Sequence, residues 1–292
     1  MKHVFHILLY KILIFLKVNS PINFYSILKS LGSGIVYIAF AYGCFVMTFN
    51  TIDYLLVTVK IGSFLLHRFI LIVLFIFFIA INVGNMVVSF STLYKSKEVF
   101  YLITKPISFT KIFLIKFLDN FFYSSATLLL IITSVLLGYG YYFDLNFWFY
   151  PFALFFLILP FMFTAGALGV IVLLIVLIMS GRWGIKKVIV SIGLIYIVSV
   201  VSFYFISNPI HLVERVFDYY PNIDQYFGFL ENSSIKFLPN YWISESLYWT
   251  SQHKIERAIP FVYANIITSL LVFGAALLIA NKFYYKTWLT SL

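Results

Sequence analysis

Residues 69–91 read FILIVLFIFFIAINVGNMVVSFS, a run of 23 residues without a charged side chain. An α-helix needs roughly 20 predominantly apolar residues to cross the hydrocarbon core of a bilayer. The apolar residues are continuous and do not alternate with polar ones, and in lipid a helix satisfies its own backbone groups. This stretch therefore predicts a transmembrane helix.

Five other segments have the same character, at about 33–57, 119–140, 150–179, 188–206 and 259–280. The whole chain is 63% hydrophobic and only 10% charged, whereas soluble domains are about half apolar and about a quarter charged. We therefore expect an all-α polytopic membrane protein that forms a single transmembrane domain over 1–292, with six transmembrane helices. The segment 150–179 contains two prolines and two glycines, so we expect it to be tilted, kinked or broken.

The basic residues predict the orientation of these helices. With the N-terminus in the cytoplasm, 14 of the 20 lysines and arginines fall in cytoplasmic segments, as the positive-inside rule requires. Both termini are then cytoplasmic, and residues 207–258 form an extracytoplasmic loop rich in tyrosine and tryptophan. We ascribe the net charge of +10 to these cytoplasmic lysines, and we expect no nucleic acid partner.

The first residues, MKHVFHILLYKILIFLKVNSP, place apolar residues at helical spacing and lysines at the margins. This pattern predicts that residues 1–30 form an amphipathic helix in the membrane interface ahead of the first span. Lysines interrupt the apolar run and no cleavage site follows, which argues against a signal peptide.

Motifs for chemistry are absent from the sequence. It contains no Gly-x4-Gly-Lys-[Ser/Thr] phosphate loop, no His-Glu-x-x-His and no Gly-x-Ser-x-Gly. Cys44 is the single cysteine, so neither an internal disulfide nor a cysteine zinc site can form. We therefore expect no catalytic, cofactor-binding or metal-binding residue.

Residues 95–116, KSKEVFYLITKPISFTKIFLIK, form a compact basic segment between two apolar ones. An apolar stripe that includes Phe100 lies opposite Lys95, Lys97 and Glu98 in a helix that Pro106 ends. A second helix then starts, with Ser108 or Thr110 as its cap. The residues themselves leave two interpretations open: a docking surface for a partner, or an interfacial segment whose lysines contact anionic lipid.

Three stretches resemble the ABC-2 type permeases, the membrane subunits of bacterial ABC exporters. In SKEVFYLITKPISFTKIFLIKFLDNFFYSS (96–125), Glu98, Pro106, Ile107, Ser108 and Lys116 follow the order of that family's cytoplasmic segment. FLPNYWISESL (237–247) is similar to its Leu-Pro-Ser-x-Trp run, with asparagine in place of serine, and NKFYYKTW (281–288) is similar to its tyrosine-rich exit from the membrane.

This resemblance implies a permease subunit of an ABC exporter in the bacterial cytoplasmic (inner) membrane. It would be a transport subunit, not an enzyme, without its own nucleotide-binding motif or cofactor, and a partner ABC ATPase would bind the ATP. The ATPase-coupling segment 94–116 would use eight residues: Lys95, Lys97, Glu98, Phe100, Lys105, Pro106, Ser108 and Lys111.

Related exporters often continue into a second membrane half, whereas this sequence stops after its sixth predicted span. The resemblance therefore implies pairing with a second copy or with a second permease. Two alternatives stay open: a membrane enzyme or lipid-handling protein with its site in 207–258, and a non-transport immunity or sensor subunit. An outside carboxylate essential for turnover would distinguish the enzyme. The sequence does not indicate the substrate.

Overall fold

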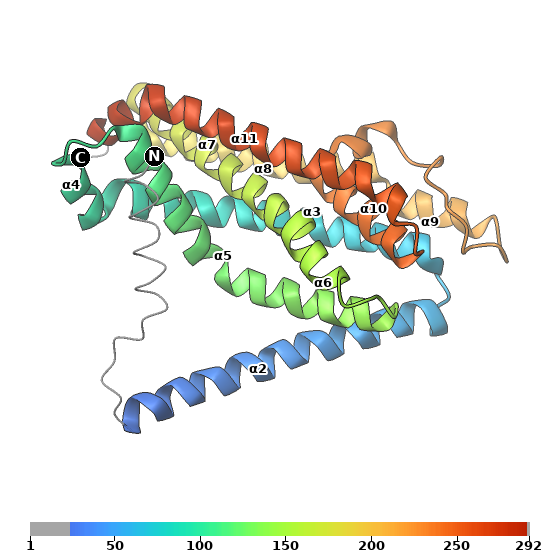
Figure 1. Ribbon diagram of the computed structural model, residues 1–292. Helices are drawn as coiled ribbons and strands as arrows, with labels where there is room; N and C mark the ends of the chain where they lie inside the picture. The colour runs from blue at the N-terminus through green and yellow to red at the C-terminus, as the bar shows by residue number, and fades with distance from the viewer. Residues whose placement is uncertain (1–23, 291–292) are drawn as a thin grey trace.

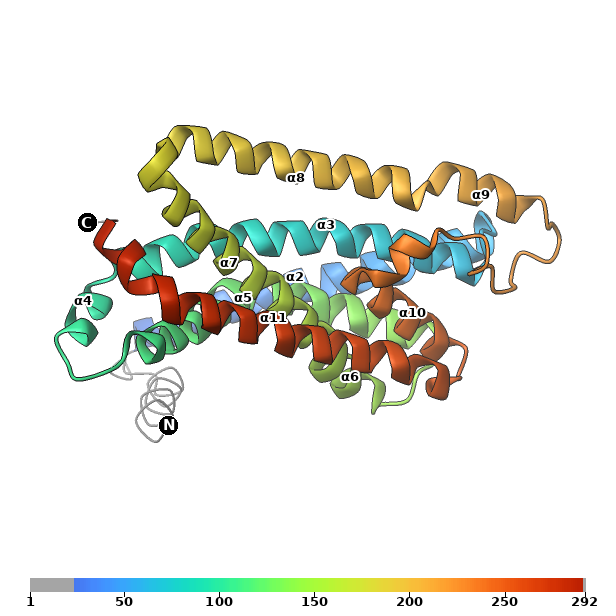
Figure 2. The same cartoon turned by 90° about the horizontal axis from the view of Figure 1, so that it is seen from above.

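The computed structural model describes residues 24–290, and every regular element in that range is helical. Long helices run back and forth along the molecule (Figure 1, Figure 2). They are α2 (Phe24–Asp53), α3 (Gly62–Phe90), α5 (Phe109–Tyr142), α7 (Leu159–Trp183), α8 (Ile185–Ser207) and α11 (Ile255–Thr290). The predicted all-α class is confirmed for the described residues.

Shorter elements connect the long helices. Three π-helical turns, η1 (Tyr54–Thr58), η2 (Ser91–Lys95) and η3 (Ala153–Ile158), extend α2 and α3 and precede α7. The other short elements are α4 (Lys97–Ile103), α6 (Phe149–Phe152), α9 (Pro209–Phe217), the 3-10 helix η4 (Ser233–Phe237) and α10 (Pro239–Ser251).

Within residues 24–290, five helical runs are long and apolar enough to cross a membrane: Leu31–Thr58, Gly62–Lys95, Phe149–Gly181, Lys186–Phe217 and Ile255–Leu289. Two halves of α5, Phe109–Phe122 and Thr127–Tyr142, meet at 49° and make a sixth candidate when they are taken as one bent span. The predicted interfacial helix over 1–30 lies outside the described residues, apart from 24–30, which are the first turns of α2.

The alternating helix directions divide the connections between two ends of the molecule (Figure 2). The start of α2, residues 91–108, the α7–α8 junction and the end of α11 lie at one end, here called the basic end. The other end carries α6, α9, η4 and α10, and is called the cap end. Residues 209–237, from α9 through η4, are called the cap.

Large apolar side chains on α2 and α8 face outward. Ile38 is 71% exposed, Met47 is 72% exposed and Phe205 is 74% exposed. Exposed apolar surface of this extent is rare in soluble monomers and typical of surfaces that contact another apolar phase. The two helices are compatible with a membrane protein.

Helix α7 occupies the middle of the bundle and packs against α3 on one side and α11 on the other. Gly169 makes the approach to α3 possible, because a Cβ atom there would lie 2.3 Å from the backbone oxygen of Asn82. Two buried apolar clusters form around this contact, one toward the cap end and one toward the basic end.

Within the continuous run Phe149–Gly181, the irregularity is the π-helical turn η3, which lies between Pro151 in α6 and Pro160 in the first turn of α7. Pro160 has no N–H to bond the carbonyl of Phe156, four residues earlier. The side-chain amide of Asn265, on α11, donates instead to the carbonyls of Phe156 at 3.4 Å and Leu157 at 2.8 Å. The freed backbone groups are thus satisfied by a neighbouring helix.

Replacing Asn265 by leucine removes these two bonds and leaves carbonyls buried in apolar surroundings. We expect Asn265→Leu to lower the free energy of unfolding by about 1–2 kcal/mol, measured by thermal unfolding of the protein in detergent. Leu271→Ala is the control, because Leu271 on the same helix is 68% exposed. Equal effects of the two variants would contradict the role of Asn265.

Candidate functional site

The predicted coupling segment folds as a short helix, a turn and the start of a long helix at the basic end (Figure 1). The hydroxyl of Ser96 accepts a hydrogen bond from the N–H of Val99 at 3.3 Å and caps α4. Ser108 occupies the cap position of α5 without a side-chain bond, and the Thr110 hydroxyl donates instead to the side-chain oxygen of Asn281, on α11, at 2.7 Å.

The inner side of this segment is fastened to the end of α11. Val99 and Leu102 of α4 are buried in the apolar cluster of the basic end. The Tyr284 hydroxyl donates to the carbonyl of Leu93 at 2.7 Å, and the Tyr94 hydroxyl shares a hydrogen bond with Thr287 at 2.9 Å. The turn η2, directly before α4, is therefore held on α11, far from it in sequence.

The outer side carries the predicted coupling residues. All eight are exposed in the structure: Lys95, Lys97, Glu98, Phe100, Lys105, Pro106, Ser108 and Lys111. Phe100 also touches α11, with its ring centroid 5.7 Å from that of Trp288. The structure brings these residues together on one exposed surface of η2, α4 and the first turn of α5, which we call the basic surface.

Lys116, on α5, faces carboxylates of both α4 and α5. The Lys116 ammonium lies 3.6 Å from the Asp119 carboxylate and forms a closer ion pair with Glu98. The Lys116 side chain is 5% exposed and that of Glu98 is 43% exposed. This bond ties α4 to α5 from the edge of the basic surface.

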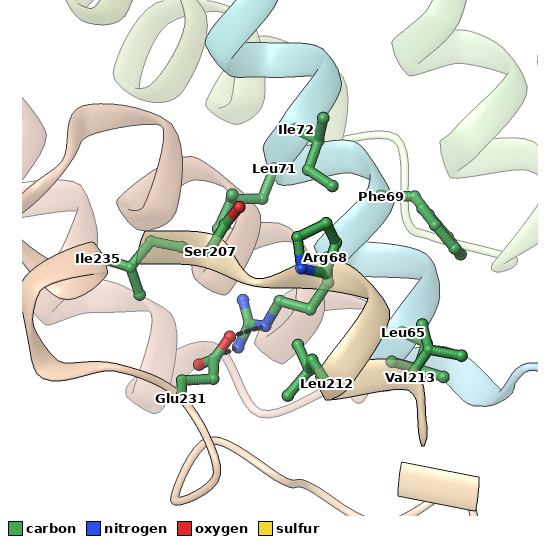
Figure 3. Close-up of a pocket in the computed structure, with 11 residues that line it drawn as sticks. Leu65, Arg68, Phe69, Leu71, Ile72, Ser207, Leu212, Val213, Glu231 and Ile235 are labelled. Atoms are coloured by element: carbon green, nitrogen blue, oxygen red, sulfur yellow. Dashed lines mark hydrogen bonds and ion pairs between the residues drawn. The ribbon is translucent and has the colours of Figure 1, made fainter. Parts of the chain in front are cut away.

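A second cluster of charged residues lies buried at the cap end. Arg68, on α3, forms ion pairs with Glu231 of the cap and with Glu245 of α10. Figure 3 shows its guanidinium pointing at the Glu231 carboxylate. The Arg68 side chain is 8% exposed, and those of Glu231 and Glu245 are 3% and 0% exposed. We call these three residues the charge cluster.

Aromatic residues complete the surroundings of the charge cluster. The Tyr226 hydroxyl and the Trp249 indole N–H donate to one oxygen of Glu245, at 3.1 and 2.9 Å. The hydroxyl of Tyr241 donates to Glu231 at 3.4 Å. The guanidinium of Arg68 lies 4.5 Å from the ring centroid of Phe64, within cation–π range.

Burial dominates the electrostatics of the cap residues. Removal from water raises the pKa of Glu231 to about 7, although the positive charge of Arg68 opposes this shift. Burial also raises the pKa of the Tyr226 and Tyr241 hydroxyls, so both are neutral donors. Two carboxyl groups and one guanidinium thus share a buried site.

A pocket beside the charge cluster has a cavity volume of about 20 Å³ and is lined by Arg68, Glu231, Ser207 of α8 and apolar side chains of α3 and the cap. Such a volume holds about one water molecule. Among residues 24–290, no group of three or more His, Cys, Asp or Glu side chains could hold a metal ion. The charge cluster is thus suited to binding a proton or a water molecule, and it is too small for a larger ligand.

Sequence reasoning missed the charge cluster. It placed Glu231 and Glu245 in the predicted extracytoplasmic loop 207–258 and Arg68 in another outside segment, and nothing in the sequence brought the three together. One signal was present: Arg68 stands directly before the uncharged run 69–91. Position alone does not separate a boundary arginine that faces water from one that is buried against distant carboxylates.

Comparison with known proteins finds one family that matches the chain. The family described as "Putative ATP-binding cassette" matches residues 22–292. No curated protein and no solved structure matches the chain significantly. An ABC transporter context fits this family.

This match overturns three expectations from the sequence. The predicted membership in the ABC-2 type permeases is wrong, because the matching family is described as an ATP-binding cassette. The role of a permease subunit driven by a separate ATPase is contradicted for the same reason. The description as a transport subunit without its own nucleotide-binding motif is contradicted as well, since an ATP-binding cassette has such a motif.

Removing the positive charge at Arg68 should strongly destabilise the protein, because two buried carboxyl groups would lose their partner. We expect Arg68→Met to lower the free energy of unfolding by about 3–5 kcal/mol, measured by thermal unfolding in detergent. Adding Glu231→Gln and Glu245→Gln to this variant should recover most of the loss. Arg215→Met, on the exposed side of α9, is the control, and an equal loss there would contradict the importance of the charge cluster.

Proposed function

Because the chain belongs to the family described as "Putative ATP-binding cassette", we propose that it is a membrane-embedded helical component of an ATP-binding cassette assembly. In this role the chain lies in the membrane and contacts the rest of the assembly through one surface. No transport pathway through the helices is part of this role.

One observation carries the proposal: the family match over 22–292 includes all five helical runs that are long and apolar enough to cross a membrane. The apolar helices are thus part of what defines the family, and not an addition to it. The exposed apolar faces of α2 and α8 support a lipid environment, because such faces would associate in water.

We place the chain in the bacterial cytoplasmic membrane with six crossings, taking α5 as one bent span. The basic end faces the cytoplasm and the cap end faces outward, with both chain termini on the cytoplasmic side. The excess of lysine and arginine in the connections of the basic end supports this orientation.

The basic surface is the proposed contact for an ABC ATPase subunit of the assembly. Its exposed lysines suit an acidic partner, and its backbone is fixed to α11 through Tyr94 and Tyr284. A force on this surface therefore acts on a helix that runs the length of the molecule. A second copy or a sister membrane subunit would cover part of the exposed faces of α2 and α8, and lipid would cover the rest.

The orientation predicts which side of the membrane labels an introduced cysteine. In a Cys44→Ser background, Ser233→Cys in the cap should react with an impermeant maleimide added to intact spheroplasts. Ser108→Cys should react only after the membrane is opened, and both residues are exposed. Labelling of Ser108→Cys in intact spheroplasts would contradict the orientation.

Reversing charge on the basic surface should weaken ATPase binding. We expect a variant with glutamate at Lys95, Lys97, Lys105 and Lys111 to retain at most about a tenth of the co-purified ATPase, a loss of about 1.4 kcal/mol or more. The control reverses Lys60, Arg215, Lys236 and Lys254 at the cap end, which gives the same change in net charge. Co-purification is measured in mild detergent at low ionic strength, because salt screens exposed charges.

The purified protein is also tested for ATP binding, which the family description names. The purified chain is irradiated with a photoreactive ATP analogue in the presence and absence of excess ATP. Labelling of the chain itself, without any co-purifying ATPase, would overturn the partner proposal and place the nucleotide site in this chain. Equal ATPase recovery with both reversed variants would also overturn it.

A further inference from the structure

The charge cluster has one more negative group than positive groups. Glu231 and Glu245 both accept a hydrogen bond from the same nitrogen of Arg68, so their carboxyl groups are close neighbours. If both were ionised, one negative charge would be buried without compensation, which is costly. Two carboxyl groups that share a site commonly keep one proton between them.

The two carboxyl groups are not equivalent. Glu245 accepts from three donors, Arg68, Tyr226 and Trp249, and its side chain is fully buried on α10. Glu231 faces two nitrogens of Arg68 and accepts the longer bond from Tyr241, and it borders the small pocket (Figure 3). Both carboxyl groups thus have donors, and Glu231 is the one that can exchange a proton with water at the pocket.

The other charged and titratable groups around Glu231 do not supply the missing compensation. The Tyr226 and Tyr241 hydroxyls are neutral donors, and Lys236, whose positive charge lowers the pKa of Glu231 only in part, is exposed to solvent on η4. The α9 residues at the pocket are apolar. The surrounding titratable groups, from α3, the cap and α10, are Arg68, Tyr226, Lys236, Tyr241 and Glu245.

We propose that the charge cluster is a proton-binding site that controls the cap: Glu231 holds the cap on α3 when it carries a proton, and the cap loosens when the proton leaves. With the proton in place, the cluster has one cation and one anion and is neutral. Without it, the cluster has a net negative charge that only water can stabilise. Moving the cap away from α3 exposes Glu231 to that water.

The direction of the pH dependence follows from the proton balance. The pKa of Glu231 is raised from 4.5 to about 7 in the closed cap, so the closed cap binds a proton more tightly than the open one does. The stabilisation is complete below about pH 4.5 and is lost as the pH rises to about 7. Above that value, the opening equilibrium should become constant.

The test measures opening of the cap with a buried thiol. In a Cys44→Ser background, Ile235→Cys places a thiol at a cap position that is 4% exposed, and Ser233→Cys gives an exposed reference two residues away. The ratio of their labelling rates cancels the intrinsic pH dependence of the thiol. We expect this ratio to rise at least about tenfold between about pH 5 and about pH 7.5.

Glu231→Gln keeps the shape of the protonated side chain and cannot ionise, so it should hold the ratio low and constant over this range. Glu214→Gln, an exposed glutamate on α9 of the same cap, should keep the full rise. A rise of equal size in Glu231→Gln, or no rise in the parent protein, would overturn the proposal.

A second measurement covers the case in which Ile235→Cys does not fold. The unfolding temperature of the unmodified chain should fall between about pH 5 and about pH 7.5, and Glu231→Gln should remove most of that fall. Identical pH profiles of the two proteins would overturn the proposal. Neither measurement depends on an ATPase, so its outcome is separate from that of the proposed function.

Discussion

A buried guanidinium sets the arrangement of the cap end. Arg68 belongs to an apolar helix, and its two carboxylate partners come from positions 163 and 177 residues later in the chain. A cation with so little access to water requires these partners, because an unpaired buried charge costs several kcal/mol. The chain after α8 must therefore return to α3, and this return places α10 inside the bundle between α3 and α11. Tyrosines and a tryptophan then fill the space around the charges and supply the remaining hydrogen bonds.

Buried polar groups without charge also find partners in the apolar middle of the molecule. The proline that starts α7 leaves a carbonyl of η3 without its usual donor, and an asparagine from α11 supplies one. At the α3–α7 crossing, the amide of Asn82 donates to the carbonyl of Ala165 at 3.0 Å, and Tyr196 of α8 donates to the same side chain. Few polar residues occur in these helices, and Asn82, Tyr196 and Asn265 link one helix to another. Hydrogen bonds of this kind fix the relative positions of helices that apolar packing alone would leave free to slide.

Local sequence patterns predicted the helices. They did not predict contacts between residues that lie far apart in the sequence. Uninterrupted apolar runs identified the long helices, and Pro106 indicated that α4 ends before the turn, whereas the cap of α4 by Ser96 was not predicted. The bend in α5 falls on residues 122–127, which contain two serines but no proline or glycine, so composition gave no warning of it. The Glu98–Lys116 pair and the charge cluster join residues on different helices, and periodicity carries no information about such pairs. Three short motifs also led to the wrong family, because each is compatible with many membrane proteins, whereas the family match extends over 22–292.

Helix α11 gives the molecule a mechanical connection between its two ends. Its 36 residues correspond to a rod about 54 Å long at 1.5 Å per residue. Near its C-terminal end, Trp288 touches Phe100 of α4, and near its start it packs against α10, which carries Glu245. Pro260 is the one proline within it. If α4 tilted, α11 would move with it. The other end of α11 would then displace α10, the helix that carries Glu245. In such a lever, the two ends cannot adjust independently, and a load applied at one end changes the fit of side chains at the other.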